Sequence, residues 1–151
     1  YVNAGVGGTT SQFGAARVEE DVLKYKPDLV MIEFSVNDDN TDFFRETYEG
    51  LVRKVYGNPI EPAVLLIHNI CYDTGISAEE KHREIGSHYK LPSVSMKTTI
   101  YPEVVSGAIP VRDITPDDLH SHRHWLSAYP ASLPSLHFLP ASHIRFRENV
   151  K

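Results

Sequence analysis

Residues 29–34 read Leu-Val-Met-Ile-Glu-Phe, residues 35–40 read Ser-Val-Asn-Asp-Asp-Asn, and this stretch decides the fold class. Pro27 and Asp28 precede the apolar run, and a polar turn follows it. A short, nearly continuous apolar run between turn signals is typical of a strand that helices cover on both faces. We therefore predict a central parallel strand over residues 29–34.

Helices and strands alternate on both sides of this strand. Apolar spacing and end signals predict helices over residues 11–26, 41–56 and 77–89, and strands over residues 63–70 and 92–96. Thr41 is the expected N-cap of the second helix, and Ser77, three residues before Glu80, that of the third. Alternating strands and helices form right-handed βαβ units, so we predict an α/β fold: a three-layer α/β/α sandwich around a parallel sheet.

Length and composition exclude several classes of protein. The 151 residues amount to about one domain, and no apolar run approaches the roughly 20 residues of a membrane-spanning helix. Residues 1–120 hold 11 Lys and Arg against 19 Asp and Glu, and this acidic balance argues against a nucleic-acid partner. The single cysteine, Cys71, cannot form an internal disulfide, which favours a reducing compartment, and we expect a cytoplasmic location.

Three polar segments follow predicted strands or loops and could carry chemistry. Residues 3–10 read Asn-Ala-Gly-Val-Gly-Gly-Thr-Thr between a strand end and a helix start, where backbone N–H groups can face an anion. The segment lacks both phosphate-loop motifs, because Thr10 stands where GxGxxG needs glycine and no GK[ST] is present. A tight structural turn is the alternative for it.

The other two segments are Ser35–Asp38 and Asp117–His120. Asn37 lies at the carboxyl end of a predicted strand, the edge where open α/β sheets bind ligands, although the local sequence alone favours a polar turn that caps the next helix. Asp117 and His120 have the DxxH spacing of a carboxylate that orients a general base. A solvated loop is the alternative for this pair.

In this order, the three segments resemble the SGNH, or GDSL-like, hydrolases over residues 1–120, and bacterial carbohydrate O-acyl esterases in particular. The resemblance implies a flavodoxin-like fold and a Ser-His-Asp acyl-enzyme mechanism. It assigns Gly8 and Asn37 to the oxyanion hole, Asp117 and His120 to the triad, and Asp118 as an alternative acid. No metal or organic cofactor is implied.

The nucleophile of that family does not occur in this sequence. Its GDS block lies upstream of the glycine loop, so the resemblance implies a chain that lacks the first strand and its Ser. Ser11 and Ser35 lie close to the predicted site without the neighbours of a nucleophile elbow. Cys71 with His68 is a further alternative, and a buried, inert thiol is the simpler interpretation of Cys71.

Residues 121–151 break the pattern of the preceding chain. They hold four basic residues against one acidic residue, three prolines and no glycine. The family continues after its His with a segment like PNDxGH, and the codons for residues 121–125, read one base later, can encode Pro, Ile or Thr, Asp, Ile or Thr, and Gly. A reading-frame change after His120 is therefore our hypothesis for an atypical tail. The alternation of His120, His122 and His124 leaves a metal site as the alternative.

The sequence thus predicts an ester hydrolase for small acyl groups, such as acetyl groups on a sugar, whose residues 1–151 alone are inactive. The alternative is a non-catalytic remnant that binds a carbohydrate or acylated ligand. We expect a small-molecule or carbohydrate ester as partner, no nucleic acid and no membrane. A sheet that lacks a strand would also expose an edge, which can pair with a second chain.

Overall fold

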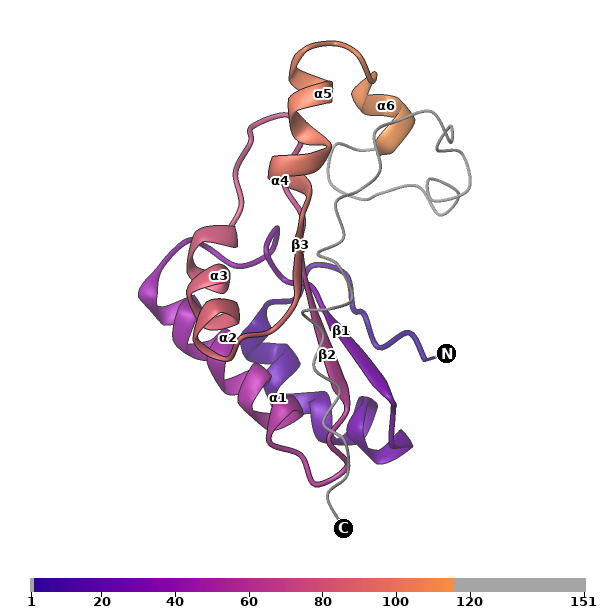
Figure 1. Ribbon diagram of the computed structural model, residues 1–151, viewed down its shortest axis with the longest axis vertical. Helices are drawn as coiled ribbons and strands as arrows, with labels where there is room; N and C mark the ends of the chain where they lie inside the picture. Colours follow the sequence, from indigo (N-terminus) through magenta and orange to yellow (C-terminus); the bar gives the residue numbers. More distant parts are fainter. Residues whose placement is uncertain (1, 116–151) are drawn as a thin grey trace.

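The computed structural model describes residues 2–115, which form an α/β fold around a three-stranded parallel sheet (Figure 1). The strands lie in the order β1-β2-β3, with Leu29 opposite Ala63 and Leu66 opposite Ser93. The predicted α/β class with a parallel sheet is confirmed. The elements are α1 Ser11–Asp21, the 3-10 helix η1 Leu23–Tyr25, β1 Leu29–Ile32, α2 Asp42–Tyr56, β2 Ala63–His68, α3 Glu79–His88, β3 Ser93–Ser95, α4 Met96–Thr99, α5 Tyr101–Val105 and α6 Val111–Ile114.

Helix α2 follows directly from its sequence. The Thr41 hydroxyl accepts the Phe44 N–H and caps the first turn, as expected. The apolar face of α2 is fully buried against α1 and the inner face of the sheet, where Val30, Ile32, Val64 and Leu66 point. Burial of this face supplies most of the stability of the helix, because an isolated helix of this length is marginal in water.

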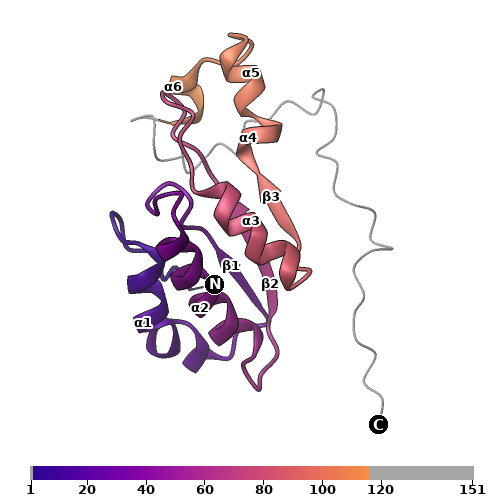
Figure 2. The same ribbon diagram turned by 90° about the vertical axis from the view of Figure 1, so that its left-hand side faces the viewer.

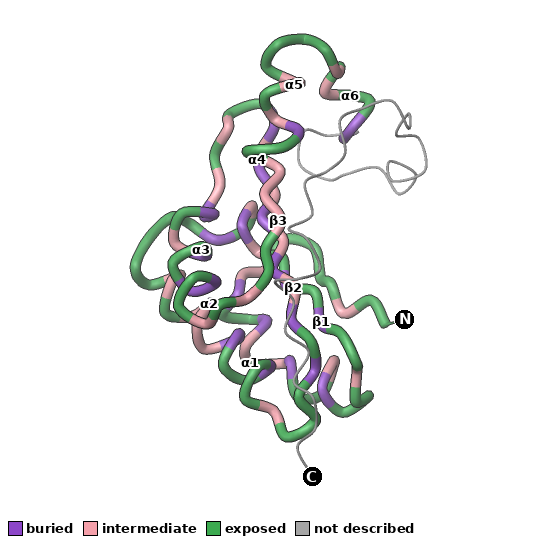
Figure 3. The backbone as a smooth tube through the Cα atoms, viewed as in Figure 1, coloured by how far each residue is buried: buried purple, intermediate pink, exposed green. Residues whose placement is uncertain are grey.

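Strand β1 differs from the prediction of a central strand buried on both faces. Within residues 2–115 it is an edge strand, and its residues alternate between exposed and buried. Leu29 and Met31 are 52% and 55% exposed, whereas Val30 and Ile32 pack under α1 and α2 (Figure 3). The continuous apolar run concealed this alternation because its outward residues are as apolar as its inward ones.

Helix α3 begins at Glu79, one residue later than an N-cap at Ser77 would place it. Ala78, not Ser77, occupies the N-cap position. The Ser77 hydroxyl donates to the carbonyl oxygen of Asn69 at 2.8 Å and accepts the Glu79 N–H at 3.1 Å. The hydroxyl therefore joins the start of α3 to the end of β2, and this tertiary contact moves the helix start.

Three short helices, α4, α5 and α6, lie beyond the carboxyl end of β3, away from α1 and α2 (Figure 2). They form a second apolar cluster with Ile70 and Tyr72 from the loop after β2. The sequence did not predict them, because helices of four or five residues are too short to show a helical period. Between residues 2 and 115 no helix is long and apolar enough to cross a membrane.

Candidate active site

The candidate site lies at the carboxyl end of the sheet, where the chain leaves β1 and β2. Ser35 joins the segment that follows β1 to the segment that follows β2. Its hydroxyl accepts the Asn69 N–H at 2.7 Å and lies 2.8 Å from Glu33 Oε1. Its carbonyl oxygen accepts the Ala78 N–H at 2.7 Å. One buried serine thus fixes the turn after β1 against the loop after β2 and the start of α3.

The turn after β1 presents Asn37 to solvent. The N–H groups of Asn37 and Asp38 both donate to the carbonyl oxygen of Phe34, at 3.1 and 2.9 Å. Asn37 is exposed while Ser35 and Asp38, on either side, are buried. No hydrogen bond holds the Asn37 side-chain amide in the part of the chain that the structure describes, so this amide is available to a ligand.

The glycine loop of residues 3–10 is held by three contacts. The Asn3 side-chain oxygen accepts the Gly5 N–H at 2.9 Å, the Thr9 hydroxyl donates to Val6, and Arg17 donates to the carbonyl oxygen of Ala4 at 2.6 Å. Gly8 is exposed and has a φ of 70°, a left-handed conformation that favours glycine. The loop therefore needs glycine at the position that the resemblance assigns to the oxyanion hole.

The Asp38 carboxylate joins the glycine loop to the Asn37 turn. One oxygen, Oδ1, accepts the N–H of Ser11, the first residue of α1, at 2.8 Å, and the other, Oδ2, lies 3.0 Å from His82 Nε2. The side chains of Asp38 and His82 are fully buried. A carboxylate only accepts hydrogen bonds, so His82 Nε2 carries the proton. Asp38 thereby also places a negative charge at the N-terminus of α1, where the helix dipole stabilises it.

Helix α3 holds this turn at two further points. The side-chain amide of Asn40 donates to Glu80 at 3.0 Å, and its oxygen accepts the Lys81 N–H at 3.3 Å. Lys81 also pairs with Asp42 at 2.9 Å, and the hydrogen bond and charge of Lys81 hold the pKa of Asp42 below its usual value. The first turns of α3 therefore support the loop that carries Asn37.

Two more buried rings lie behind the Asp38–His82 pair. Tyr48 stacks on His82, and burial, with the charges of Glu33 and Asp38, raises the pKa of Tyr48 above its usual value. The ring of His68 lies 6.2 Å from that of His82, and neither of its nitrogens has a hydrogen-bond partner. Burial, and then the charges of His82 and Arg83, lowers the pKa of His68 to about 4, so His68 is neutral at pH 7.

The alternative nucleophiles are poorly placed. Ser11 and Ser35 are fully buried, and their hydroxyls bond to Thr47 at 2.8 Å and to Glu33 at 2.8 Å. Among residues 2–115 neither ring nitrogen of His68 has a hydrogen-bond partner, so His68 does not activate Cys71 as a base in this arrangement. Cys71 itself is partly exposed, which differs from the buried thiol expected from the sequence.

The remaining predicted residues lie outside the described residues. They are the triad candidates Asp117 and His120, the alternative acid Asp118, and His122 and His124 of the metal alternative. Residues 2–115 contain no group of three or more His, Cys, Asp or Glu side chains that could hold a metal ion. Sequence reasoning missed His82, although the buried positions 79, 82 and 86 of α3 have the spacing of one helix face.

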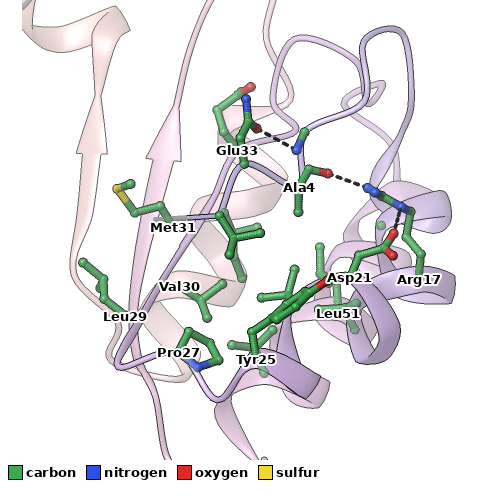
Figure 4. A pocket seen from close by; sticks show the side chains of 18 of the residues that line it. Ala4, Arg17, Asp21, Tyr25, Pro27, Leu29, Val30, Met31, Glu33 and Leu51 are labelled. Atoms are coloured by element: carbon green, nitrogen blue, oxygen red, sulfur yellow. Dashed lines mark hydrogen bonds and ion pairs between the residues drawn. The ribbon is translucent and has the colours of Figure 1, made fainter.

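The structure also has a cavity of about 730 Å³, on the outer side of β1 (Figure 4). Val2, Tyr25 and Leu29 line it together with the Arg17–Asp21 ion pair, and all three of these apolar side chains are more than half exposed. Neither Gly8 nor Asn37 lines the cavity. Asn3, Ala4 and Gly5 line it, however, so the cavity at the sheet edge adjoins the start of the glycine loop.

Comparison with known proteins shows that the chain is similar to an esterase. No protein-family model matches the sequence, and no curated protein is significantly similar to it. Two solved structures of a two-domain esterase active on acetylated mannans, one co-crystallised with mannopentaose, are each 64% identical with a TM-score of 0.78. The resemblance to carbohydrate esterases is confirmed.

The match covers 80% of this chain and 33% of the mannan esterase, so the chain spans about a third of the length of this esterase relative. A gut microbial diltiazem-metabolizing enzyme is 15% identical, with a TM-score of 0.55 over 80% of this chain and 35% of its own. At that identity the second similarity shows the fold alone. The esterase relative is therefore the comparison that bears on function.

Proposed function

We propose that the chain is part of a carbohydrate O-acyl esterase of the SGNH type, which removes acetyl groups from a sugar. One observation carries the proposal: the chain is 64% identical to an esterase active on acetylated mannans. The exposed Asn37 amide and the glycine loop at the carboxyl end of the sheet support it, because this edge is where α/β folds bind ligands.

In the proposed reaction a serine from outside this chain attacks the ester carbonyl. His120 takes the proton of the serine, Asp117 orients the imidazole, and the Gly8 N–H and the Asn37 amide donate to the oxyanion. The intermediate collapses, His120 protonates the departing sugar oxygen, and the acetyl group stays on the serine. Water, activated by His120, then releases acetate and restores the serine.

Residues 1–151 alone should have negligible esterase activity, since they contain no serine in the nucleophile position. The test compares this chain with an extended chain in which an upstream segment carrying a GDS block precedes Tyr1. Both are assayed with p-nitrophenyl acetate and acetylated mannan. Activity that needs the added segment and is lost when its GDS serine becomes alanine supports the proposal. Turnover by residues 1–151 that disappears in His120→Ala contradicts it.

A second function, ligand binding without catalysis, has its own support. The similar esterase was co-crystallised with mannopentaose, and the two serines beside the candidate site, Ser11 and Ser35, are fully buried. Calorimetry of residues 1–151 with mannopentaose separates the two functions. Binding without hydrolysis, together with an inactive extended chain, favours a binding remnant.

A further inference from the structure

We propose that Asp38 and His82 are positioning residues that set the separation of the two oxyanion donors, Gly8 and Asn37. This inference rests on the proposed function. Neither residue is assigned to the triad or the oxyanion hole, and neither is accessible to substrate, since both side chains are fully buried. They would act only through the backbone segments that they join.

The connection between the donor segments is narrow. Gly8 lies three residues before Ser11, and Asn37 directly precedes Asp38. The bond from the Ser11 N–H to Asp38 is the hydrogen bond that joins the start of α1 to the turn after β1 among residues 2–115. Gly14 of α1 also lies against Phe34. Loss of the bond should therefore let the glycine loop move relative to Asn37.

His82 fixes the orientation of the bridging carboxylate. With Oδ2 held by His82 Nε2, Oδ1 is directed at the Ser11 N–H. The imidazole is itself held, because it lies in α3 and stacks on Tyr48. If His82 could not donate, a buried carboxylate oxygen would lose its partner, which is costly in a dry interior. The carboxylate would then turn or draw in water, and the bond to Ser11 would weaken.

His68 provides a matched comparison for His82. Both are fully buried histidines with ring centroids 6.2 Å apart, but the His68 ring has no hydrogen-bond partner within residues 2–115. His82→Leu and His68→Leu therefore remove the same chemical group from nearly the same place. Only His82→Leu removes the support of Asp38.

Ser11 provides the second matched pair. Ser11→Pro removes the N–H that Asp38 accepts, at the first position of a helix, where proline is well tolerated. Thr10 before it is already extended, with φ −99° and ψ 170°, as a residue preceding proline prefers. Ser11→Ala keeps the N–H and loses only the hydroxyl bond to Thr47.

The first measurement uses residues 1–151 labelled with ¹⁵N, and reads the Gly8 backbone amide and the Asn37 side-chain amide by NMR. Ser11→Pro and His82→Leu should shift or broaden both signals, while Ser11→Ala and His68→Leu leave them in place. His82→Gln, whose amide can donate to Asp38, should restore them. This measurement needs no catalysis, so it stands even if the extended chain proves inactive.

The second measurement is kinetic and uses the extended chain. Ser11→Pro and His82→Leu should lower kcat about 10- to 100-fold with little change in KM, because displaced donors affect the transition state more than the ground state.

Equal spectra and equal kcat within each matched pair would overturn the inference. If His82→Leu does not fold, the Ser11 pair decides. If the extended chain is inactive and the amide signals are displaced in Ser11→Pro and His82→Leu, the esterase function is wrong. The role of Asp38 and His82 in positioning the two segments is then still supported.

Discussion

The imidazole of His82 lies face to face with the phenol ring of Tyr48, with ring centroids 3.6 Å apart and ring planes 5° from parallel. Tyr48 comes from α2 and His82 from α3, so this stack joins the two helices behind the candidate site. The Tyr48 hydroxyl is buried and has no hydrogen-bond partner in the part of the chain that the structure describes. The stabilising part of Tyr48 is therefore its ring.

Tyr48→Phe should leave the free energy of unfolding unchanged or raise it by up to about 1 kcal/mol, because it removes a buried hydroxyl without a partner. Tyr48→Leu should lower it by roughly 2–4 kcal/mol, through loss of the stacked ring and the space left behind. Urea denaturation followed by circular dichroism measures both. A larger loss in Tyr48→Phe than in Tyr48→Leu would mean that the hydroxyl, not the ring, stabilises the fold.

Gly14→Ala should destabilise the protein by about 1–2 kcal/mol. The new Cβ would lie 2.6 Å from Phe34 Cζ, so the Phe34 ring or α1 must shift. Gly50→Ala is the control: its Cβ would meet nothing within 4 Å, and it should raise stability by roughly 0.5–1 kcal/mol through helix propensity. Thermal unfolding of the two variants gives the comparison, and equal shifts in the same direction would contradict the close packing.

Stability should fall as the pH is lowered from about 6.5 to about 4. The pKa of His68 is about 4 in the folded protein, against a usual value of 6.5, so in this window the unfolded chain binds the proton and the folded one does not. The contribution of neutral His68 to the free energy of unfolding is complete above pH 6.5 and is lost below pH 4. It amounts to up to about 3 kcal/mol.

The test of this pH dependence is the free energy of unfolding at several pH values for the natural sequence and for His68→Leu. The leucine variant should show a shallower fall between pH 6.5 and 4. Parallel curves for the two proteins would show that another group titrates in this window.

Asn37→Ala in the extended chain should lower kcat about 100- to 1000-fold, the usual cost of one oxyanion-hole donor. Asn58→Ala is the control, since Asn58 lies in the turn before β2, where its side chain accepts the Ile60 N–H. Initial rates on acetylated mannan give kcat and KM. If the two asparagine variants are equally active, Asn37 does not bind the oxyanion.

The free edge of β1 should make residues 1–151 associate at high concentration. An unpaired strand with exposed Leu29 and Met31 offers backbone groups and apolar surface to a second chain. Met31→Lys should reduce the association, whereas Ile76→Lys, which changes a 69% exposed residue in a loop, should not. Sedimentation velocity over a range of concentrations measures this. A chain that stays monomeric would remove self-association from the expected partners.

The sequence predicted the helices and strands that short sequence patterns specify. It missed the features that depend on contacts between residues far apart in the chain. The helical period and the cap at Thr41 predicted α2 to within one residue. The order of the motifs also singled out Asn37 and Gly8, both of which are exposed. The bond between Asp38 and His82 joins residues 44 apart, and no local pattern reports such a pair. The sequence predicted an exposed sheet edge but did not assign it to β1, since neighbours in a sheet are not neighbours in sequence.

The loops at the two ends of the sheet differ in how well they can tolerate insertions. Ser35, Asn69 and Ala78 are bonded to one another at the carboxyl end, so an insertion there would separate Asn37 from its supports. The turn between α2 and β2 lies at the opposite end (Figure 1), where Asn58 bonds only to nearby residues. Relatives can therefore differ in length at that turn without displacing Gly8 or Asn37.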